Sequence, residues 1–132
     1  MILFVCTGNT CRSPMAEALA RVHGVEAQSA GISANPGEPA SPQARRIAKL
    51  YGADLSQHRA RRVNEAMLRQ AAQVWTMSPL HREMLVQVYP EYAGKISSFY
   101  PPIPDPFGGD DQVYAQCAES LLSAMEQEGM IT

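Results

Sequence analysis

The stretch that decides the fold is Met1-Ile-Leu-Phe-Val-Cys-Thr-Gly-Asn-Thr-Cys-Arg-Ser-Pro14, at the start of the chain. Residues 1–5 are apolar and partly β-branched, which is the pattern of a strand buried in a parallel sheet. Ser13-Pro14, followed by Met15-Ala16-Glu17, is typical of the beginning of a helix. The residues between them predict a tight turn from strand to helix that holds a thiol, Cys6.

The turn between Cys6 and Arg12 has the composition of an anion-binding loop. Its residues are small or polar: Thr7, Gly8, Asn9, Thr10 and Cys11. Their backbone N–H groups can turn inward around one ligand, and the helix that starts near Ser13 points its positive end at the same place. The Arg12 guanidinium adds a two-pronged donor. We therefore expect residues 7–13 to bind a tetrahedral dianion such as phosphate.

Cys6 is the expected nucleophile of this loop. A thiolate attacks, whereas an ordinary cysteine is mostly protonated at neutral pH, so the positive surroundings of the loop are needed to favour the charged form. In-line attack on a phosphoryl group would form a cysteinyl-phosphate, which water then hydrolyses. The loop lacks the Gly-Lys-Ser/Thr ending of a nucleotide P-loop, so nucleotide binding is not expected.

Length, composition and charge predict a single domain spanning residues 1–132. Of its 132 residues 45% are hydrophobic, the net charge is −2, and lysine and arginine form no sustained run. We therefore expect neither nucleic acid nor a membrane as a partner. No export signal or membrane-spanning stretch is recognisable, so we expect a cytoplasmic protein. We also expect it to be a monomer.

The cysteines and histidines outside the loop have ordinary structural interpretations. With three cysteines and no export signal, free thiols are expected, and Cys117 falls on the apolar face of the last helix. No histidine pair has metal-ligand spacing, so we expect no metal and no cofactor. His23 and His81 are expected at the surface or at helix ends.

Strands and helices alternate along the rest of the chain. Apolar runs predict further strands at residues 25–30, 73–77 and 95–98. Helix starts are expected at Ser41-Pro42, Asn64, Ser78-Pro79 and Asp110-Asp111. The alternation predicts a three-layer α/β domain with a four-stranded parallel sheet in a flavodoxin-like winding. Ligands of such sheets bind at the carboxyl ends of the strands, where Cys6 lies.

Residue patterns also predict which side chains of two further segments are buried or exposed. The helix after Ser78 is expected to bury an apolar face made of Leu80, Met84, Leu85 and Val88. The basic residues before Asn64 are expected to form a solvated face, with contact to an acidic substrate segment as the alternative: Arg59, Arg61 and Arg62.

The loop and several later motifs resemble the low-molecular-weight protein tyrosine phosphatase family, whose loop is Cys-x-Gly-Asn-x-Cys-Arg-Ser near the N-terminus. The resemblance covers nearly the whole chain and includes Ser29-Ala30-Gly31, the run Ser56 to Arg61 and Asp105-Pro106. It implies a phosphorylated protein as the substrate and a catalytic role for Cys6 and Arg12. It also implies hydrogen-bonded support of the loop by Asn9, Ser13, Ser29 and His58.

The mechanism requires a proton donor to the leaving group, placed opposite the thiolate. By resemblance to the family, Asp105 is this general acid, and Pro104 and Pro106 fix the path of its backbone. The alternative is that Asp105 only initiates a turn, as most Asp-Pro pairs do.

Two positions bear on which phosphorylated residue is hydrolysed. Thr10 stands where tyrosine-specific members usually have isoleucine, and Asp105-Pro106 is followed by Phe107-Gly108-Gly109 instead of two tyrosines. Both features resemble the protein arginine phosphatase branch. Threonine is compact and polar at the pocket wall, and Asp105 can pair with a guanidinium, whereas Phe107 stacks on a phenol or a guanidinium alike. We favour phosphoarginine, with phosphotyrosine as the alternative.

Two other functions use a similar loop. Arsenate reduction needs further cysteines, and residues 74–92 contain none. A non-catalytic phosphopeptide-binding module would keep the loop but would not need Cys6, Arg12 and Asp105 together. The role of Cys11 stays open between a small buried loop residue and a partner for Cys6 in a reversible, protective disulfide.

Overall fold

Residues 1–132 of the computed structural model form four parallel strands in one sheet, with the strand order β2-β1-β3-β4. The strands are β1 (Ile2–Cys6), β2 (Ala27–Gly31), β3 (Gln73–Thr76) and β4 (Ile96–Ser98). The parallel sheet and the flavodoxin-like winding predicted from the sequence are confirmed. The observed strand ends differ from the predicted ones by one or two residues.

Helices connect successive strands, and one more follows the last strand. They are α1 (Arg12–Val22), α2 (Pro42–Leu50), α3 (Glu65–Gln70), α4 (Pro79–Val88), the 3-10 helix η1 (Pro90–Lys95) and α5 (Asp111–Gln127). Four of the expected N-caps are present, since each of these side chains accepts a hydrogen bond from the first turn of its helix: Ser41, Asn64, Ser78 and Asp110. The helix start expected at Ser13 is wrong in detail, because α1 already begins at Arg12 and has no side-chain cap. None of the helices is long and apolar enough to span a membrane.

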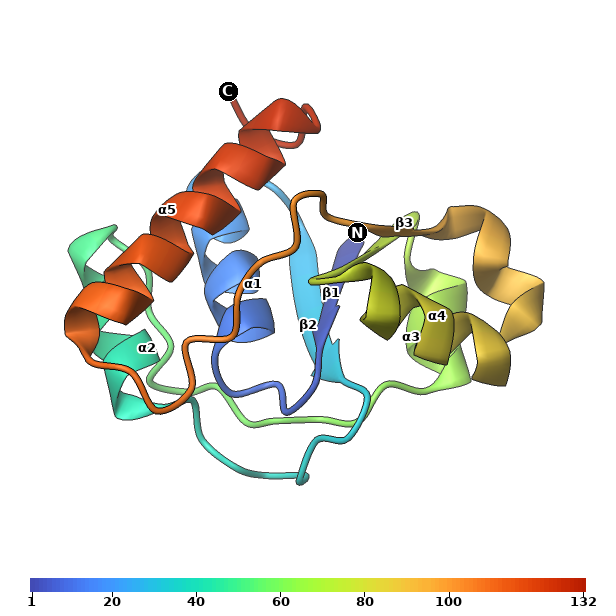
Figure 1. The fold of residues 1–132 in the computed structure, drawn as a ribbon, viewed down its shortest axis with the longest axis horizontal. Helices are drawn as coiled ribbons and strands as arrows, with labels where there is room; N and C mark the ends of the chain where they lie inside the picture. The colour runs from blue at the N-terminus through green and yellow to red at the C-terminus, as the bar shows by residue number, and fades with distance from the viewer.

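The helices form two layers, one on each face of the sheet (Figure 1). Helices α1, α2 and α5 lie on one side, and α3 and α4 lie on the other. Alternation along β1 divides the core between them, because Phe4 and Cys6 pack in the first layer whereas Leu3 and Val5 pack in the second. The thiol of Cys6 is thereby placed on the side of α1 and α5.

The connections that follow β1 and β2 lie at the lower edge of the molecule in Figure 1. The chain beyond β2 holds the loop that follows β1, since Ile32 N–H donates to the Cys6 carbonyl and Ser33 N–H to the Thr7 carbonyl, both at 2.9 Å. Residues 99–110, between β4 and α5, run down to the same edge. Segments from three parts of the chain therefore meet where β1 ends.

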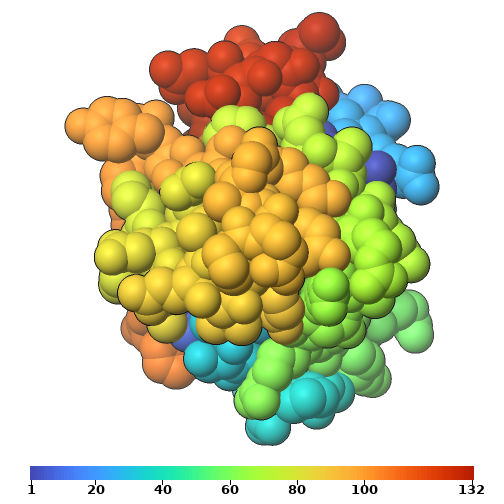
Figure 2. All heavy atoms as spheres, turned by 90° about the vertical axis from the view of Figure 1, so that its right-hand side faces the viewer, coloured from blue at the N-terminus to red at the C-terminus, as the bar shows by residue number.

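The apolar face expected on α4 is only partly correct. Leu85 is 2% exposed, whereas Leu80, Met84 and Val88 are 63%, 41% and 67% exposed. Residues four apart share one side of a helix, so His81 and Leu85 face the sheet and the neighbouring row of three faces solvent. Figure 2 shows this side of the molecule, with α4 and η1 in yellow and orange. His81 therefore occupies a core-facing position on α4, where only the apolar side chains of the helix were expected.

Gly31, at the end of β2, lies directly against the backbone of the loop that follows β1. A Cβ atom there would lie 2.6 Å from the Thr7 carbonyl oxygen and 3.0 Å from the Asn9 amide nitrogen. Both are backbone atoms, so the loop itself would have to move. We predict that Gly31→Ala lowers the free energy of unfolding by about 1–3 kcal/mol, measured by urea denaturation.

Gly94→Ala is the matched control for this change, because a Cβ atom at Gly94 meets no atom within 4 Å. Its unfolding free energy should stay close to that of the wild type. Equal stability of the two variants would contradict the role given to Gly31.

Candidate active site

The backbone N–H groups of the loop after β1 are available to an anion. Those of residues 8–13 donate to no backbone carbonyl of the chain. Helix α1 begins at Arg12 with neither a side-chain cap nor an acidic residue in its first turn. Free N–H groups and the positive end of the helix dipole both favour negative charge at this point. The loop therefore has the structure of a preformed anion cradle.

The cradle is the floor of a pocket of about 290 Å³. The residues that line it are Cys6, Thr7, Gly8, Thr10, Cys11, Arg12, Glu38, Asp105 and Phe107. Asn9 and Ser13, also expected to bind phosphate, are completely buried beneath this lining, and their backbone N–H groups donate to no backbone carbonyl. Glu38, from the connection between β2 and α2, was not anticipated, because a single exposed carboxylate in a loop gives no sequence signal.

Cys6 lies at the bottom of the pocket and is 3% exposed. Its sulfur is 2.9 Å from Ser13 Oγ. Ser13 Oγ accepts from Asn9 Nδ2 at 2.9 Å, and its own proton has two acceptors within reach, the Cys6 sulfur at 2.9 Å and the Ala30 carbonyl at 3.4 Å. A hydroxyl donor at this distance stabilises a thiolate.

Asn9 holds the loop in an unusual conformation. Its φ angle is 57° and it is completely buried, a backbone state that residues other than glycine rarely adopt. Its Nδ2 donates to Ser13 Oγ and to Ser29 Oγ, at 2.9 and 3.0 Å, and its Oδ1 accepts from Arg61 N–H at 3.0 Å. His58 Nε2 lies 2.8 Å from the Asn9 carbonyl oxygen. The side chain of Asn9 therefore joins the loop to β2 and to the segment before α3.

Arg61 takes part in this support, and the expected solvated basic face is wrong for this residue. Besides the bond from its backbone, its Nε donates to the Ser29 carbonyl at 3.2 Å and its Nη2 to Gln28 Oε1 at 2.9 Å. Arg59 and Arg62 are exposed, as expected. The sequence signal that could have indicated this role is the position of Arg61 at the end of the run Ser56 to Arg61, which also contains His58.

Arg12 and Asp105 meet above the cradle from opposite ends of the chain. Arg12 is 7% exposed, its Nη1 donates to the Ile103 carbonyl at 3.1 Å, and its Nη2 lies 3.7 Å from Asp105 Oδ2. The Asp105 side chain is 55% exposed, and its Oδ1 accepts from Phe107 N–H at 3.1 Å. The turn typical of an Asp-Pro pair is thus present, and it leaves the second carboxylate oxygen directed toward Arg12.

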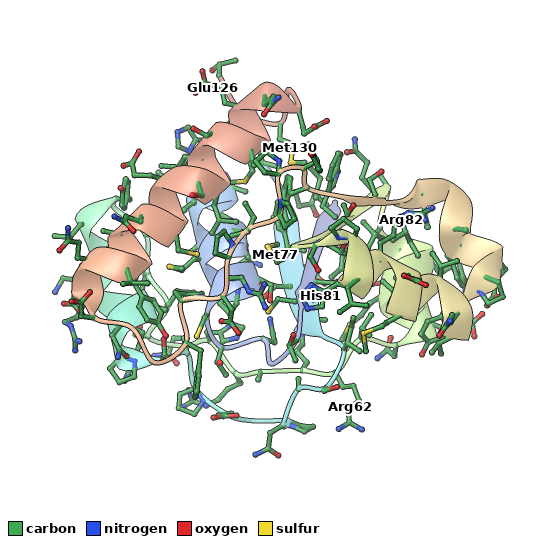
Figure 3. The ribbon with its side chains drawn as sticks, viewed as in Figure 1. Arg62, Met77, His81, Arg82, Glu126 and Met130 are labelled. Atoms are coloured by element: carbon green, nitrogen blue, oxygen red, sulfur yellow. The ribbon has the colours of Figure 1, made fainter.

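His81 was not recognised as a site residue from the sequence; it lies at a helix end, one of its two expected places, but it is buried. It lies in the first turn of α4 and is 8% exposed. Its Nε2 is 2.7 Å from Thr7 Oγ1 and its Nδ1 is 2.9 Å from Ser78 Oγ. Burial, followed by the nearby Arg12 charge, lowers the pKa of His81. Figure 3 shows His81 between α4 and the loop at the carboxyl end of the sheet.

Of the other two cysteines, Cys11 lines the pocket and Cys117 lies in the core. Cys11 is 6% exposed, and its sulfur is 3.2 Å from the Tyr114 hydroxyl, whose pKa burial raises to about 12. Cys117 lies in the core of the α1 and α5 layer, as expected, and burial raises its pKa to about 12. Both interpretations of Cys11 remain open in this geometry.

A buried thiol in an anion cradle, with a guanidinium and a carboxylate above it, defines the class of cysteine-dependent phosphatases. Comparison with known families agrees with this class. The model of the family described as "Low molecular weight phosphotyrosine protein phosphatase" matches residues 1–128, and the chain belongs to this family. It is therefore an enzyme, a protein phosphatase.

The relatives include arginine phosphatases as well as tyrosine phosphatases. The protein-arginine-phosphatase of Geobacillus stearothermophilus is 38% identical over 136 residues, which cover 96% of this chain and 91% of the relative. The low molecular weight protein tyrosine phosphatase from T. tengcongensis is 41% identical, with a TM-score of 0.90 over 96% and 95% of the two chains. A YwlE arginine phosphatase variant with a phosphorylated active-site serine is 31% identical, with a TM-score of 0.90 over 96% and 91%.

The bonds made by Asn9 can be separated from its backbone conformation by substitution with glycine, which adopts a positive φ freely. We predict that Asn9→Gly lowers the free energy of unfolding by about 1–3 kcal/mol, because partners such as Ser29 lose a buried hydrogen bond. It should also weaken inhibition by inorganic phosphate. Asn35→Gly, at an exposed asparagine, is the control; an equally small effect of both changes would show that the side-chain bonds of Asn9 are dispensable.

Proposed function

We propose that this enzyme hydrolyses phosphoarginine in proteins, through a cysteinyl-phosphate intermediate on Cys6 and with Asp105 as the general acid. The observation that carries this proposal is the charge pattern of the pocket. The buried guanidinium of Arg12 and the free N–H groups make part of the pocket positive, whereas two carboxylates, Asp105 and Glu38, also lie in its lining. Such a pocket suits a ligand that is anionic at one end and cationic next to it.

The reaction follows from the positions of three groups. The phosphoryl oxygens bind to the loop N–H groups and to Arg12, which also stabilise the charge of the transition state. The Cys6 thiolate attacks phosphorus and forms an S–P bond while the P–N bond breaks, and Asp105 gives its proton to the leaving nitrogen. Asp105 then takes a proton from a water molecule, whose oxygen attacks phosphorus. The S–P bond breaks, and inorganic phosphate and the thiolate are released.

Three side chains of the pocket support phosphoarginine as the substrate. A guanidinium bonded to phosphorus would lie next to Asp105 and can pair with its carboxylate. Thr10 is compact and polar, so it leaves room for the planar guanidinium where an isoleucine would fill the wall. Phe107, which is 79% exposed, offers a face on which a guanidinium stacks. The arginine phosphatases among the relatives agree with this assignment.

Phosphotyrosine is the second candidate, and the exposed ring of Phe107 is the observation that favours it, because it stacks equally well on a phenol. For phosphotyrosine the steps are the same, with the P–O bond in place of P–N. An arsenate reductase would need a further accessible cysteine, and Cys117 is 5% exposed. A binding module would have no use for a carboxylate next to Arg12.

The roles of Cys6 and Asp105 are tested by substitution. We expect Cys6→Ser to abolish turnover of phosphoarginine peptide, phosphotyrosine peptide and p-nitrophenyl phosphate. Asp105→Asn should lower kcat for both peptides by about 10²–10⁴-fold, and less for p-nitrophenyl phosphate, because nitrophenolate leaves without a proton. Asp54→Asn, at an exposed aspartate, is the control. A wild-type enzyme as inactive as Cys6→Ser would favour the binding module.

The substrate preference is tested at Thr10. We expect the wild type to have a higher kcat/KM for phosphoarginine peptide than for phosphotyrosine peptide of the same sequence. Thr10→Ile should shift this ratio toward phosphotyrosine by about tenfold or more, which is typical of a methylene-sized change in a pocket. An unchanged ratio would show that Thr10 does not select the substrate.

A further inference from the structure

We propose that His81 is a positioning residue for phosphoryl transfer: it orients the Thr7 hydroxyl so that the hydroxyl proton points into the pocket and donates to a phosphoryl oxygen. Thr7 then binds the phosphoryl group through its side chain as well as through its backbone. The proposal rests on phosphoryl transfer at Cys6, and it is independent of which amino acid carries the phosphoryl group.

The position of Thr7 allows this role. Thr7 follows Cys6 directly and lines the pocket. Its carbonyl is fixed by Ser33 N–H at 2.9 Å, so the side chain starts from a constrained backbone. Its Oγ1 has one hydrogen-bond partner in the protein, His81 Nε2 at 2.7 Å. The hydroxyl therefore lies between the imidazole and the pocket.

The bonds of Ser78 are compatible with an imidazole proton on Nε2. Ser78 Oγ accepts from His81 N–H at 3.3 Å as the cap of α4, and its own proton can be donated to His81 Nδ1 at 2.9 Å. In the proposed arrangement the ring proton of neutral His81 lies on Nε2 and is donated to Thr7 Oγ1. A hydroxyl that accepts one bond keeps its proton for another acceptor. The acceptor on the remaining side is a ligand in the pocket.

This orientation survives protonation of the ring. In the imidazolium form Nδ1–H donates to Ser78 Oγ, and Nε2–H still donates to Thr7. The charged groups that act on His81 are Arg12 of α1, which opposes its protonation, and Asp105, which favours it. Arg82, next to it on α4, is turned to the Ile96 and Ala93 carbonyls (Figure 3). A bound dianion adds negative charge near the ring, so we expect its binding to raise the pKa of His81.

Substitutions at both ends of the bond test the proposal. Thr7→Val removes the hydroxyl at constant shape, and His81→Leu removes the imidazole. His81→Gln keeps an N–H donor near the place of Nε2 but does not titrate. The measurements are kcat and KM for p-nitrophenyl phosphate and the inhibition constant of inorganic phosphate between pH 5 and 8, with His23→Gln at an exposed histidine as the control.

We expect Thr7→Val and His81→Leu each to lower kcat/KM about tenfold or more, the loss typical of one hydrogen bond to a charged group. The double variant should be no worse than either single variant, because both remove the same donor. His81→Gln should recover most of the activity. In the wild type, the part of phosphate binding that depends on His81 should strengthen as the pH falls and His81 becomes protonated. In His81→Gln this part of the pH dependence should be absent.

Three results would overturn the proposal. These are additive losses in the double variant, no recovery in His81→Gln, or wild-type activity in Thr7→Val. The last of them decides the question even if His81→Leu fails to fold. If the wild type does not turn over p-nitrophenyl phosphate, the proposed function fails. The role of His81 is then judged from the affinity for inorganic phosphate, measured directly by binding.

Discussion

The catalytic loop depends on the hydrogen bonds of one buried amide. Asn9 has a positive φ of 57°, and its bonds to Ser13, Ser29 and Arg61 hold this conformation. Without them the loop would be free to turn its N–H groups toward other acceptors, and the anion cradle would be lost. Asn9 Nδ2 also donates to Ser13 Oγ, which lies 2.9 Å from the Cys6 sulfur. The same amide therefore contacts the loop support and the neighbour of the Cys6 thiol.

The parallel sheet makes these bonds possible. Its central strand β1 ends beside β2, so the loop that leaves β1 meets Ser29 and the chain beyond Gly31. The segment before α3 reaches the loop from the side of β2, and α4 brings His81 to it from the other side of the sheet. The partners come from β2, from the segment between α2 and α3, and from α4, so the site forms only when the sheet and both helix layers are assembled.

The sequence predicted what local patterns determine. The strand, loop and helix around Cys6, and the capped helix starts, are set by neighbouring residues and were found as expected. The meeting of Arg12 with Asp105 was expected from resemblance alone, because no pattern relates residues so far apart. His81 was missed for the same reason: its partner Thr7 lies on another element. Leu80, Met84 and Val88 were misassigned because periodicity identifies an apolar side but not which row of it faces the sheet.

The free N–H groups of the loop have a consequence for turnover. In the proposed mechanism they contact phosphoryl oxygens in the substrate, in the cysteinyl-phosphate and in the released phosphate, so part of their contribution is common to all these states. Uniform stabilisation of this kind does not by itself speed a reaction. In that mechanism the rate advantage comes from the additional charge that the N–H groups and Arg12 stabilise in the transition state, and from proton transfer by Asp105, whose half-exposed side chain accepts one hydrogen bond, from Phe107 N–H.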